Sequence, residues 1–216
     1  SILYVPDSDI KNLYVDAGWK SNHIYVGDRQ EKKFEDGLVY SFTAGGSEAI
    51  LIGVWDKDKA IDKNGTVTIP DFIEFKVNEA DEDKKKCNVI SIANSVFKDN
   101  TDVKMVKIGE NIVSISENAF EGCTALVSLT IPNSITDIEN FAFDGCTSLS
   151  SIILSESLTT INRCVFNKCS ILENVVIPNT VETIREKAFN ECKNLKSIVI
   201  PNSVTDIGNG AFAGCV

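Results

Sequence analysis

Three residue types recur in this chain with the same period of 23 residues. The phenylalanine series is Phe97, Phe120, Phe143, Phe166, Phe189 and Phe212. The isoleucine series is Ile92, Ile115, Ile138, Ile161, Ile184 and Ile207. The cysteine series is Cys123, Cys146, Cys169, Cys192 and Cys215. Three independent series that keep one period without a slip indicate a repeat protein, in which each unit packs only against its neighbours.

The sequence of each unit predicts two short strands. In the unit that ends at Pro132, apolar and polar residues alternate over residues 112–115 and again over residues 129–131, as in half-buried strands. The A-F-x-x-C segment between them is too short for a full helix and suits a 3₁₀ turn. A single unit cannot bury enough apolar surface to fold alone. We therefore expect the units to stack as a solenoid, with parallel strands about 4.8 Å apart.

The shared pattern resembles a known family. The I-P, A-F-x-x-C and L-x-x-I elements of residues 87–216 are similar to the BspA-like class of leucine-rich repeats, and Leu126-x-x-Leu129-x-Ile131-x-x-Ser134 resembles its strand pattern. This resemblance implies an α/β leucine-rich-repeat solenoid, dominated by strands and with short 3₁₀ or helical turns. Residues 87–216 would contain five full units and one truncated unit. The first unit departs from the pattern at Asn100, where it lacks the cysteine.

Residues 36–86 do not follow the period. Four segments (36–42, 48–55, 65–70 and 72–77) read as short strands, and the turn dipeptides Asp36-Gly37 and Asn64-Gly65 lie between them. A solenoid needs its first face covered, so we predict a small β cap over residues 36–86. Its order of segments resembles the start of many BspA-like arrays.

Residues 1–26 resemble the unit that closes BspA-like arrays. The similarity rests on Leu3-Tyr4-Val5-Pro6, Tyr14, Gly18-Trp19 and Ile24. It implies that residues 1–26 end one array, that residues 27–35 are a linker, and that a second array begins at residue 87. The alternative is an ordinary helix and strand packed on the cap.

Composition argues against several classes of function. Lysine and arginine total 21 against 31 aspartates and glutamates, a net charge of −10, and an acidic surface without a basic stripe repels nucleic acid. The longest apolar run, residues 49–55, is far shorter than the ~20 residues of a membrane-spanning helix. The single histidine, His23, has no cysteine or carboxylate pattern nearby, so we interpret it as a surface residue. We predict no catalytic residue, no metal ligand and no cofactor.

The cysteine series suggests a metal site or disulfides, but the expected geometry disfavours both. Thiols in a straight ladder cannot surround zinc tetrahedrally, and parallel Cβ vectors about 4.8 Å apart do not suit a disulfide. We interpret the series as small buried core residues. Cys164 occupies a variable position that we expect to be exposed, and Cys87 has no assignable role.

Residues 56–75 look superficially like a calcium-binding loop. With Gly65 as the sixth position, Asp62, Asn64 and Asp71 fall at ligand positions three, five and twelve. Position one is then Ala60, which cannot bind the ion, and the flanking segments read as strands. We interpret the loop as a solvated turn.

Alternation along the second strand of each unit directs ten side chains to the outward, concave face of the sheet. They are Met105, Lys107, Ser128, Thr130, Ser151, Ile153, Asn174, Val176, Ser197 and Val199. Apolar residues beside hydrogen-bonding neighbours suit a protein or extended-peptide partner. The alternative is that β-branched residues occur there because they favour strands.

The family resemblance implies adhesion, because BspA-like proteins are surface-exposed or secreted and some bind host matrix proteins or other microbes. We therefore expect a non-catalytic protein-binding module, located extracellularly or at a cell surface. Its expected partner is a host or microbial surface or matrix protein. The alternatives are a structural spacer that projects another domain and, less favoured, a calcium-dependent binding module.

Overall fold

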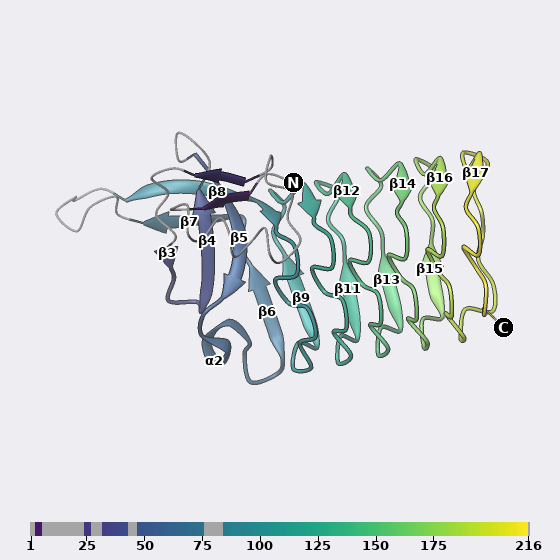
Figure 1. Ribbon diagram of the computed structural model, residues 1–216, viewed down its shortest axis with the longest axis horizontal. Helices are drawn as coiled ribbons and strands as arrows, with labels where there is room; N and C mark the ends of the chain where they lie inside the picture. Colours follow the sequence, from purple (N-terminus) through teal and green to yellow (C-terminus); the bar gives the residue numbers. More distant parts are fainter. Residues whose placement is uncertain (1–2, 6–23, 27–31, 43–46, 76–83, 216) are drawn as a thin grey trace.

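The computed structural model describes residues 3–5, 24–26, 32–42, 47–75 and 84–215. From β9 onward the chain winds into coils of similar shape that follow one another along a single axis (Figure 1). Within the described residues strands dominate, and the one helix is α2 (Lys57–Ala60). This architecture confirms the predicted solenoid.

One strand of each of the first coils joins a five-stranded parallel sheet. Its strands are β6 (Thr66–Ile69), β9 (Met105–Ile108), β11 (Ser128–Thr130), β13 (Ser151–Ile153) and β15 (Asn174–Val176). Residues one period apart lie opposite each other: Ser128 pairs with Ser151, and Ser151 pairs with Asn174. The period therefore sets the register of the sheet as well as the order of the coils.

The other flank of the solenoid is also lined by parallel strands, each two residues long in the repeats. They are β10 (Ser114–Ile115) and β12 (Asp137–Ile138), then β14 (Thr160–Ile161), β16 (Thr183–Ile184) and β17 (Asp206–Ile207). β12 and β14 belong to different sheets. The amide Nδ2 of Asn162 bridges this break, because it donates to the carbonyl of Ile138 at 2.8 Å and to Oδ1 of Asp137 at 3.0 Å.

Each A-F-x-x-C corner contains two residues with left-handed backbone. They are Ser95, Asn118, Phe141, Cys164, Lys187 and Gly210 at the first position, and Asp99, Gly122, Gly145, Lys168, Glu191 and Gly214 at the second. Some corner hydrogen bonds span three residues, as from the Cys123 N–H to the Phe120 carbonyl at 3.1 Å. The left-handed residues interrupt a 3₁₀ helix, so the expected 3₁₀ geometry is only local. Instead, the Phe120 N–H donates to the Ala142 carbonyl of the next coil at 2.8 Å.

The phenylalanine series forms a continuous stack through the interior. Neighbouring rings from Phe97 to Phe212 have centroids 5.1 to 5.7 Å apart and planes within 20° of parallel. The five rings from Phe97 to Phe189 are fully buried. Offset stacking of this kind adds about 0.5–1.5 kcal/mol per pair to the free energy of burial. Each coil therefore docks on a surface that repeats the one before it.

The four strands expected in the cap are present as β4 (Leu38–Phe42), β5 (Glu48–Val54), β6 and β7 (Phe72–Phe75). β4 and β5 are antiparallel, and β7 is antiparallel to β8 (Lys85–Ile92). β5 runs parallel to β8, and β6 runs parallel to β9. Residues 48–69 thus already follow the path of the repeats, although their sequence lacks the period.

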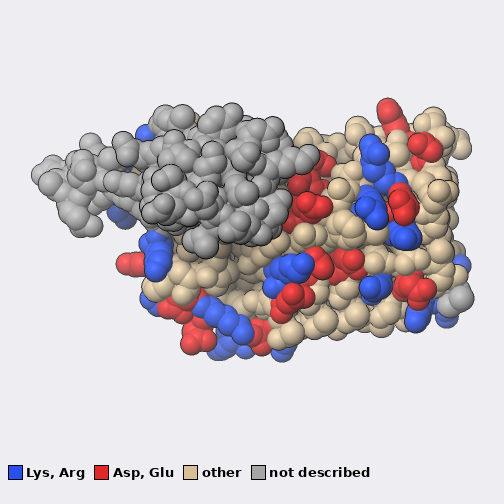
Figure 2. All heavy atoms as spheres, in the orientation of Figure 1, with Lys and Arg blue, Asp and Glu red and all other residues tan. Residues whose placement is uncertain are grey.

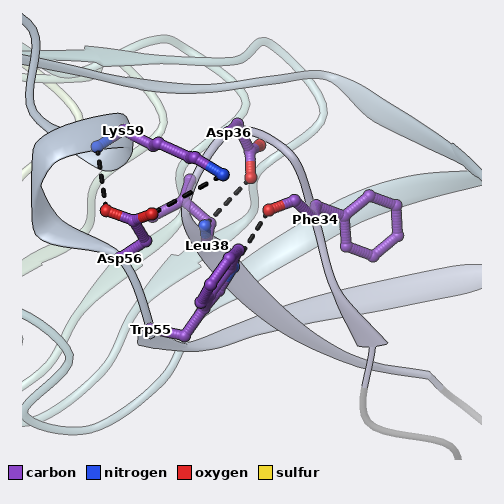
Figure 3. A network of polar contacts seen from close by, with 6 residues as sticks. All are labelled: Phe34, Asp36, Leu38, Trp55, Asp56 and Lys59. Atoms are coloured by element: carbon purple, nitrogen blue, oxygen red, sulfur yellow. Dashed lines mark hydrogen bonds and ion pairs between the residues drawn. The ribbon is translucent and has the colours of Figure 1, made fainter.

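The sheet of the cap also begins earlier than expected. β3 (Lys32–Lys33) lies inside the predicted linker and pairs with β4. Beyond it, the indole N–H of Trp55 donates to the Phe34 carbonyl at 2.9 Å, and Asp36 accepts from the Leu38 N–H at 2.9 Å (Figure 3). The Trp55 bond ties the chain before β4 to the loop that leads into α2, and the Asp36 bond closes the turn into β4. The division of the chain into domains stays a prediction.

Residues 1–26 are described only at β1 (Leu3–Val5) and β2 (Ile24–Val26), which pair in parallel. The predicted closing unit otherwise lies outside the described residues, as does His23. Its assignment to an earlier array stays a prediction.

Replacing a ring in the middle of the stack tests its contribution to stability. We expect Phe143→Ala to lower the free energy of unfolding by about 3–5 kcal/mol, because a fully buried ring leaves a cavity. Phe212→Ala is the matched control, because Phe212 is only partly buried at the end of the stack. Urea denaturation followed by circular dichroism measures both. An equal loss of unfolding free energy in the two variants would contradict the conclusion that the buried ring stack stabilises the coils.

The left-handed corners predict a stabilising substitution. Lys168 has φ of 58°, where the equivalent residues of other coils include Gly122 and Gly145. A left-handed conformation is strained for a residue with a Cβ, so Lys168→Gly is expected to raise the free energy of unfolding by about 0.5–1 kcal/mol. Lys193→Gly, at a corner residue without positive φ, should destabilise. The same urea titration compares them, and a loss of stability in Lys168→Gly would contradict the prediction.

Candidate functional site

The outward face of the five-stranded sheet carries two rows of side chains, one residue from each strand in each row. The first row, which we call the polar row, is Thr66, Met105, Ser128, Ser151 and Asn174, with Met105 as its one apolar member. The second, mixed row is Thr68, Lys107, Thr130, Ile153 and Val176. The pairing register places the members of each row next to one another. Eight of the ten residues predicted from the sequence thus lie together on this sheet.

The remaining two predicted residues do not lie in the paired sheet. Ser197 and Val199 fall in a segment, residues 195–200, that forms no strand. The regular backbone hydrogen bond from Glu173 to Ser150 has no counterpart one coil later among the described residues. The predicted strand over Ser197 and Val199 is therefore wrong. This coil is held to the one before it by the pairing of β16 with β14 and by the Phe166–Phe189 contact instead.

Two surface hollows lie over this face. The larger, of about 690 Å³, is lined by Asn174 and Val176 of β15 and by Ser197 and Val199 of the next coil. The smaller, of about 320 Å³, lies over β9 and β11. Its lining includes Met105, Lys107, Ser128 and Thr130. Ser151 and Ile153 lie between the two hollows on β13.

Apolar exposure is concentrated at one end of the face. The exposed fraction of the residue rises from 64% at Ile153 to 77% at Val176 and 82% at Val199. Single exposed apolar residues are ordinary on a protein surface, but three in successive coils form a patch. At the other end, Lys107 is the single charged residue of the two rows.

Two members of the rows were missed at the sequence level. Thr66 and Thr68 belong to β6, which pairs in register with Met105 and Lys107 of β9. Their segment lacks the 23-residue period because α2 replaces the A-F-x-x-C corner there. The alternating T-V-T-I pattern before Pro70 was the signal that could have placed them.

The cysteine series is a ladder of buried thiols, as predicted from the sequence. Cys123, Cys146, Cys169 and Cys192 have no exposed surface, and Cys215 is partly buried. Each Sγ donates to a phenylalanine carbonyl of the preceding coil, such as Cys123 to Phe97 at 3.0 Å. Burial raises the pKa of Cys123 and of Cys192 to about 12, so both remain protonated at neutral pH.

Cys164 contradicts the expectation of an exposed thiol. It is only 3% exposed, and burial raises the pKa of its thiol. The equivalent positions one coil to either side carry Phe141 and Lys187, whose larger side chains flank the small cysteine. Variability at a position was therefore a poor guide to exposure. Cys87, which had no assigned role, is a fully buried core residue of β8.

The calcium-like loop uses its carboxylates for backbone contacts. Oδ1 of Asp62 accepts from the N–H groups of Asn64 and Thr66, each at 2.8 Å. The Thr66 bond is the main reason that the pKa of Asp62 is lowered. Asp71 instead accepts the N–H of Glu110. The described residues contain no group of three or more acidic, histidine or cysteine side chains placed to hold a metal ion.

The family model for the BspA-type leucine-rich-repeat region matches residues 90–216 in six copies. The chain belongs to this family. Leucine-rich repeats generally serve as non-catalytic scaffolds for protein interaction. A comparison with curated proteins gives no match.

Several solved bacterial structures share the fold. The leucine-rich-repeat protein TpLRR of T. pallidum has 24% identity and a TM-score of 0.64, over 86% of this chain and 89% of its own. A leucine-rich cell surface protein of Faecalibacterium prausnitzii has 24% identity and a TM-score of 0.61, over 84% of this chain and 52% of its own. The pneumococcal vaccine antigen PcpA has 22% identity and a TM-score of 0.67, over 88% and 48%.

The thiols provide a direct test of the burial pattern. Alkylation by iodoacetamide requires an accessible thiolate, so at pH 8 the native chain should react first at Cys215. We expect Cys164 to react at least 10-fold more slowly, and all seven cysteines to react in urea. Peptide mass spectrometry after a timed pulse measures each site. Labelling of Cys164 at the rate of Cys215 would contradict its burial.

Proposed function

We propose that this chain is a non-catalytic protein-binding module of a microbial surface or secreted protein, with an adhesive role. Its binding site is the outward face of the five-stranded sheet, together with the adjoining coil. The observation that carries the proposal is the patch of Ile153, Val176 and Val199, which are 64–82% exposed. Val176 and Val199 also line the hollow of about 690 Å³.

The composition of the face supports a protein partner. The centre of a protein interface is depleted in charged residues and bordered by hydrogen-bonding groups. The patch matches this, because Ser151, Asn174 and Ser197 lie beside the three apolar side chains. Burial of the exposed parts of three such side chains contributes on the order of 1–2 kcal/mol each, which makes them candidates for the main binding contacts.

The structural relatives support a surface location. The Faecalibacterium prausnitzii protein is described as a cell surface protein and PcpA as a vaccine antigen. The described residues include no helix with the length and apolar character needed to cross a bilayer. On the face that Figure 2 shows, acidic and basic side chains intermingle over the repeats. Such a surface offers no extended basic field, and a protein partner fits it better than a nucleic acid.

A binding screen against immobilised host matrix and plasma proteins tests the proposal. The variant Ile153→Lys with Val176→Lys places two charges in the three-residue patch, and we expect it to weaken any captured interaction at least 10-fold. The control variant, Val113→Lys with Ile171→Lys, adds the same charge at two exposed apolar residues outside the two rows (45% and 40% exposed). It should bind as the unchanged chain does. Circular dichroism verifies that both variants fold.

The outcome separates the two remaining functions. Loss of binding in the first variant alone supports an adhesive face. If no matrix or plasma protein binds, or if both variants bind equally well, the adhesive face is wrong. The spacer that projects another domain then becomes the better account.

A further inference from the structure

We infer that the partner docks on this face as an amphipathic α-helix, which lies along the rows and therefore across the strands. The inference rests on the proposed function and adds the shape and chemistry of the partner. The expected partner helix places an apolar stripe over Ile153, Val176 and Val199, and a carboxylate near Lys107.

The spacing of the apolar patch matches a helix. Ile153 and Val176 are paired across neighbouring parallel strands, about 4.8 Å apart. The next step along the solenoid, from the coil of Val176 to the coil of Val199, is 5.4 Å between the Phe166 and Phe189 rings. Residues i, i+4 and i+7 of an α-helix span about 10.5 Å with a pitch of about 5.4 Å. Three successive coils therefore present contacts at nearly the interval of successive helical turns.

An extended peptide in the same direction matches less well. Its side chains on one face recur about every 6.7 Å, so the available intervals are ~6.7 and ~13 Å. The patch offers steps near 5 Å and a total near 10 Å. With its first side chain in place, the second and third would lie about 2 and 3 Å beyond their contacts. Helical anchors at i, i+4 and i+7 are the recurring way in which an amphipathic helix fills an apolar surface.

Charge indicates the kind of residue that the partner helix carries at its far end. Lys107 lies two coils before Ile153 in the same row, through Thr130, or about 10 Å away. That distance equals about two helical turns. Although the whole chain is acidic, with a net charge of −10, the two rows contain this one cation and no carboxylate. An aspartate or glutamate seven residues before the first apolar anchor is complementary to it.

The polar row completes the arrangement along one side of the helix. Ser128, Ser151 and Asn174 lie in register beside Thr130, Ile153 and Val176. Their short side chains leave room for a helix about 10 Å wide. They also offer hydroxyl and amide groups to the polar flank of the partner.

A patterned peptide library tests the helix directly. Eighteen-residue peptides of one composition are displayed on phage, half with apolar residues at i, i+4 and i+7 and half with strict alternation. Selection on the full 216-residue chain should enrich the helical half at least 10-fold. The enrichment should vanish on the variant Ile153→Lys with Val176→Lys. It should persist on the variant Val113→Lys with Ile171→Lys.

A charge swap tests the contact at Lys107. A selected helical peptide with glutamate seven positions before its first anchor should bind Lys107→Glu at least 5-fold more weakly. Lysine in place of that glutamate should restore the affinity. Lys168→Glu, a matched change at an exposed corner residue, should leave the affinity unchanged. Fluorescence anisotropy measures each Kd.

Two results would overturn the inference. One is enrichment of the alternating half through Ile153 and Val176, which refutes the helix while the proposed binding face stands. The other is the absence of any enrichment of the helical half. The screen against matrix proteins tests the proposed function separately, so the two failures are distinguishable.

Discussion

The structure depends on a stacking interaction that repeats without a change of register. From the coil of Phe120 to the coil of Phe189, each coil places a phenylalanine on the ring before it and a cysteine thiol against a carbonyl of the coil before it. Its corner N–H groups donate to carbonyls of the coil after it. The Phe120–Phe143 pair illustrates this, with a centroid distance of 5.4 Å and an angle of 5° between planes. Each contact requires the same number of residues between neighbours. A single insertion would move an inward side chain to the surface, because strand side chains alternate.

The repeated interior leaves the outward rows free to vary. Leu129, Ile152 and Val175 point inward at equivalent positions and are nearly buried, whereas Thr130, Ile153 and Val176 point outward one residue later. The inward series must remain apolar because it closes the core. The outward series has no such requirement. Its change from charged at Lys107 to apolar at Val199 can therefore determine which partner binds. The proposed binding face follows from this separation.

The 23-residue period predicted most of the fold, because residues one period apart stack on one another in neighbouring coils. The coils from residue 87 onward, the parallel register and the buried thiols all follow from residues that recur 23 positions apart. The cap was harder to predict, because residues 48–69 form a coil with α2 as its corner and do not follow the 23-residue period. Its strands were predictable from alternation, but their parallel pairing with β8 and β9 depends on tertiary contacts.

The errors have physical causes of a similar kind. Cys164 is buried although the equivalent positions of the neighbouring coils carry Phe141 and Lys187, and a single unit does not reveal this. Ser197 and Val199 match the strand pattern, yet the five-stranded sheet ends at β15. Alternation predicts which side chains of a strand share a face, but it does not predict whether the strand finds a hydrogen-bonding partner. The outward residues of the site could be named from the sequence. Their exposure and the hollows between coils required the structure.

Deletion of whole and partial units tests the stacking rule most directly. Removing residues 133–155, one full period, should leave a folded chain with a single cooperative urea transition and lower stability. Removing only residues 133–144, half a period, should abolish that transition, because the remaining half unit cannot align its ring and strands with the neighbours. Circular dichroism follows both. A half-unit deletion that is as stable as the full-unit deletion would contradict the account.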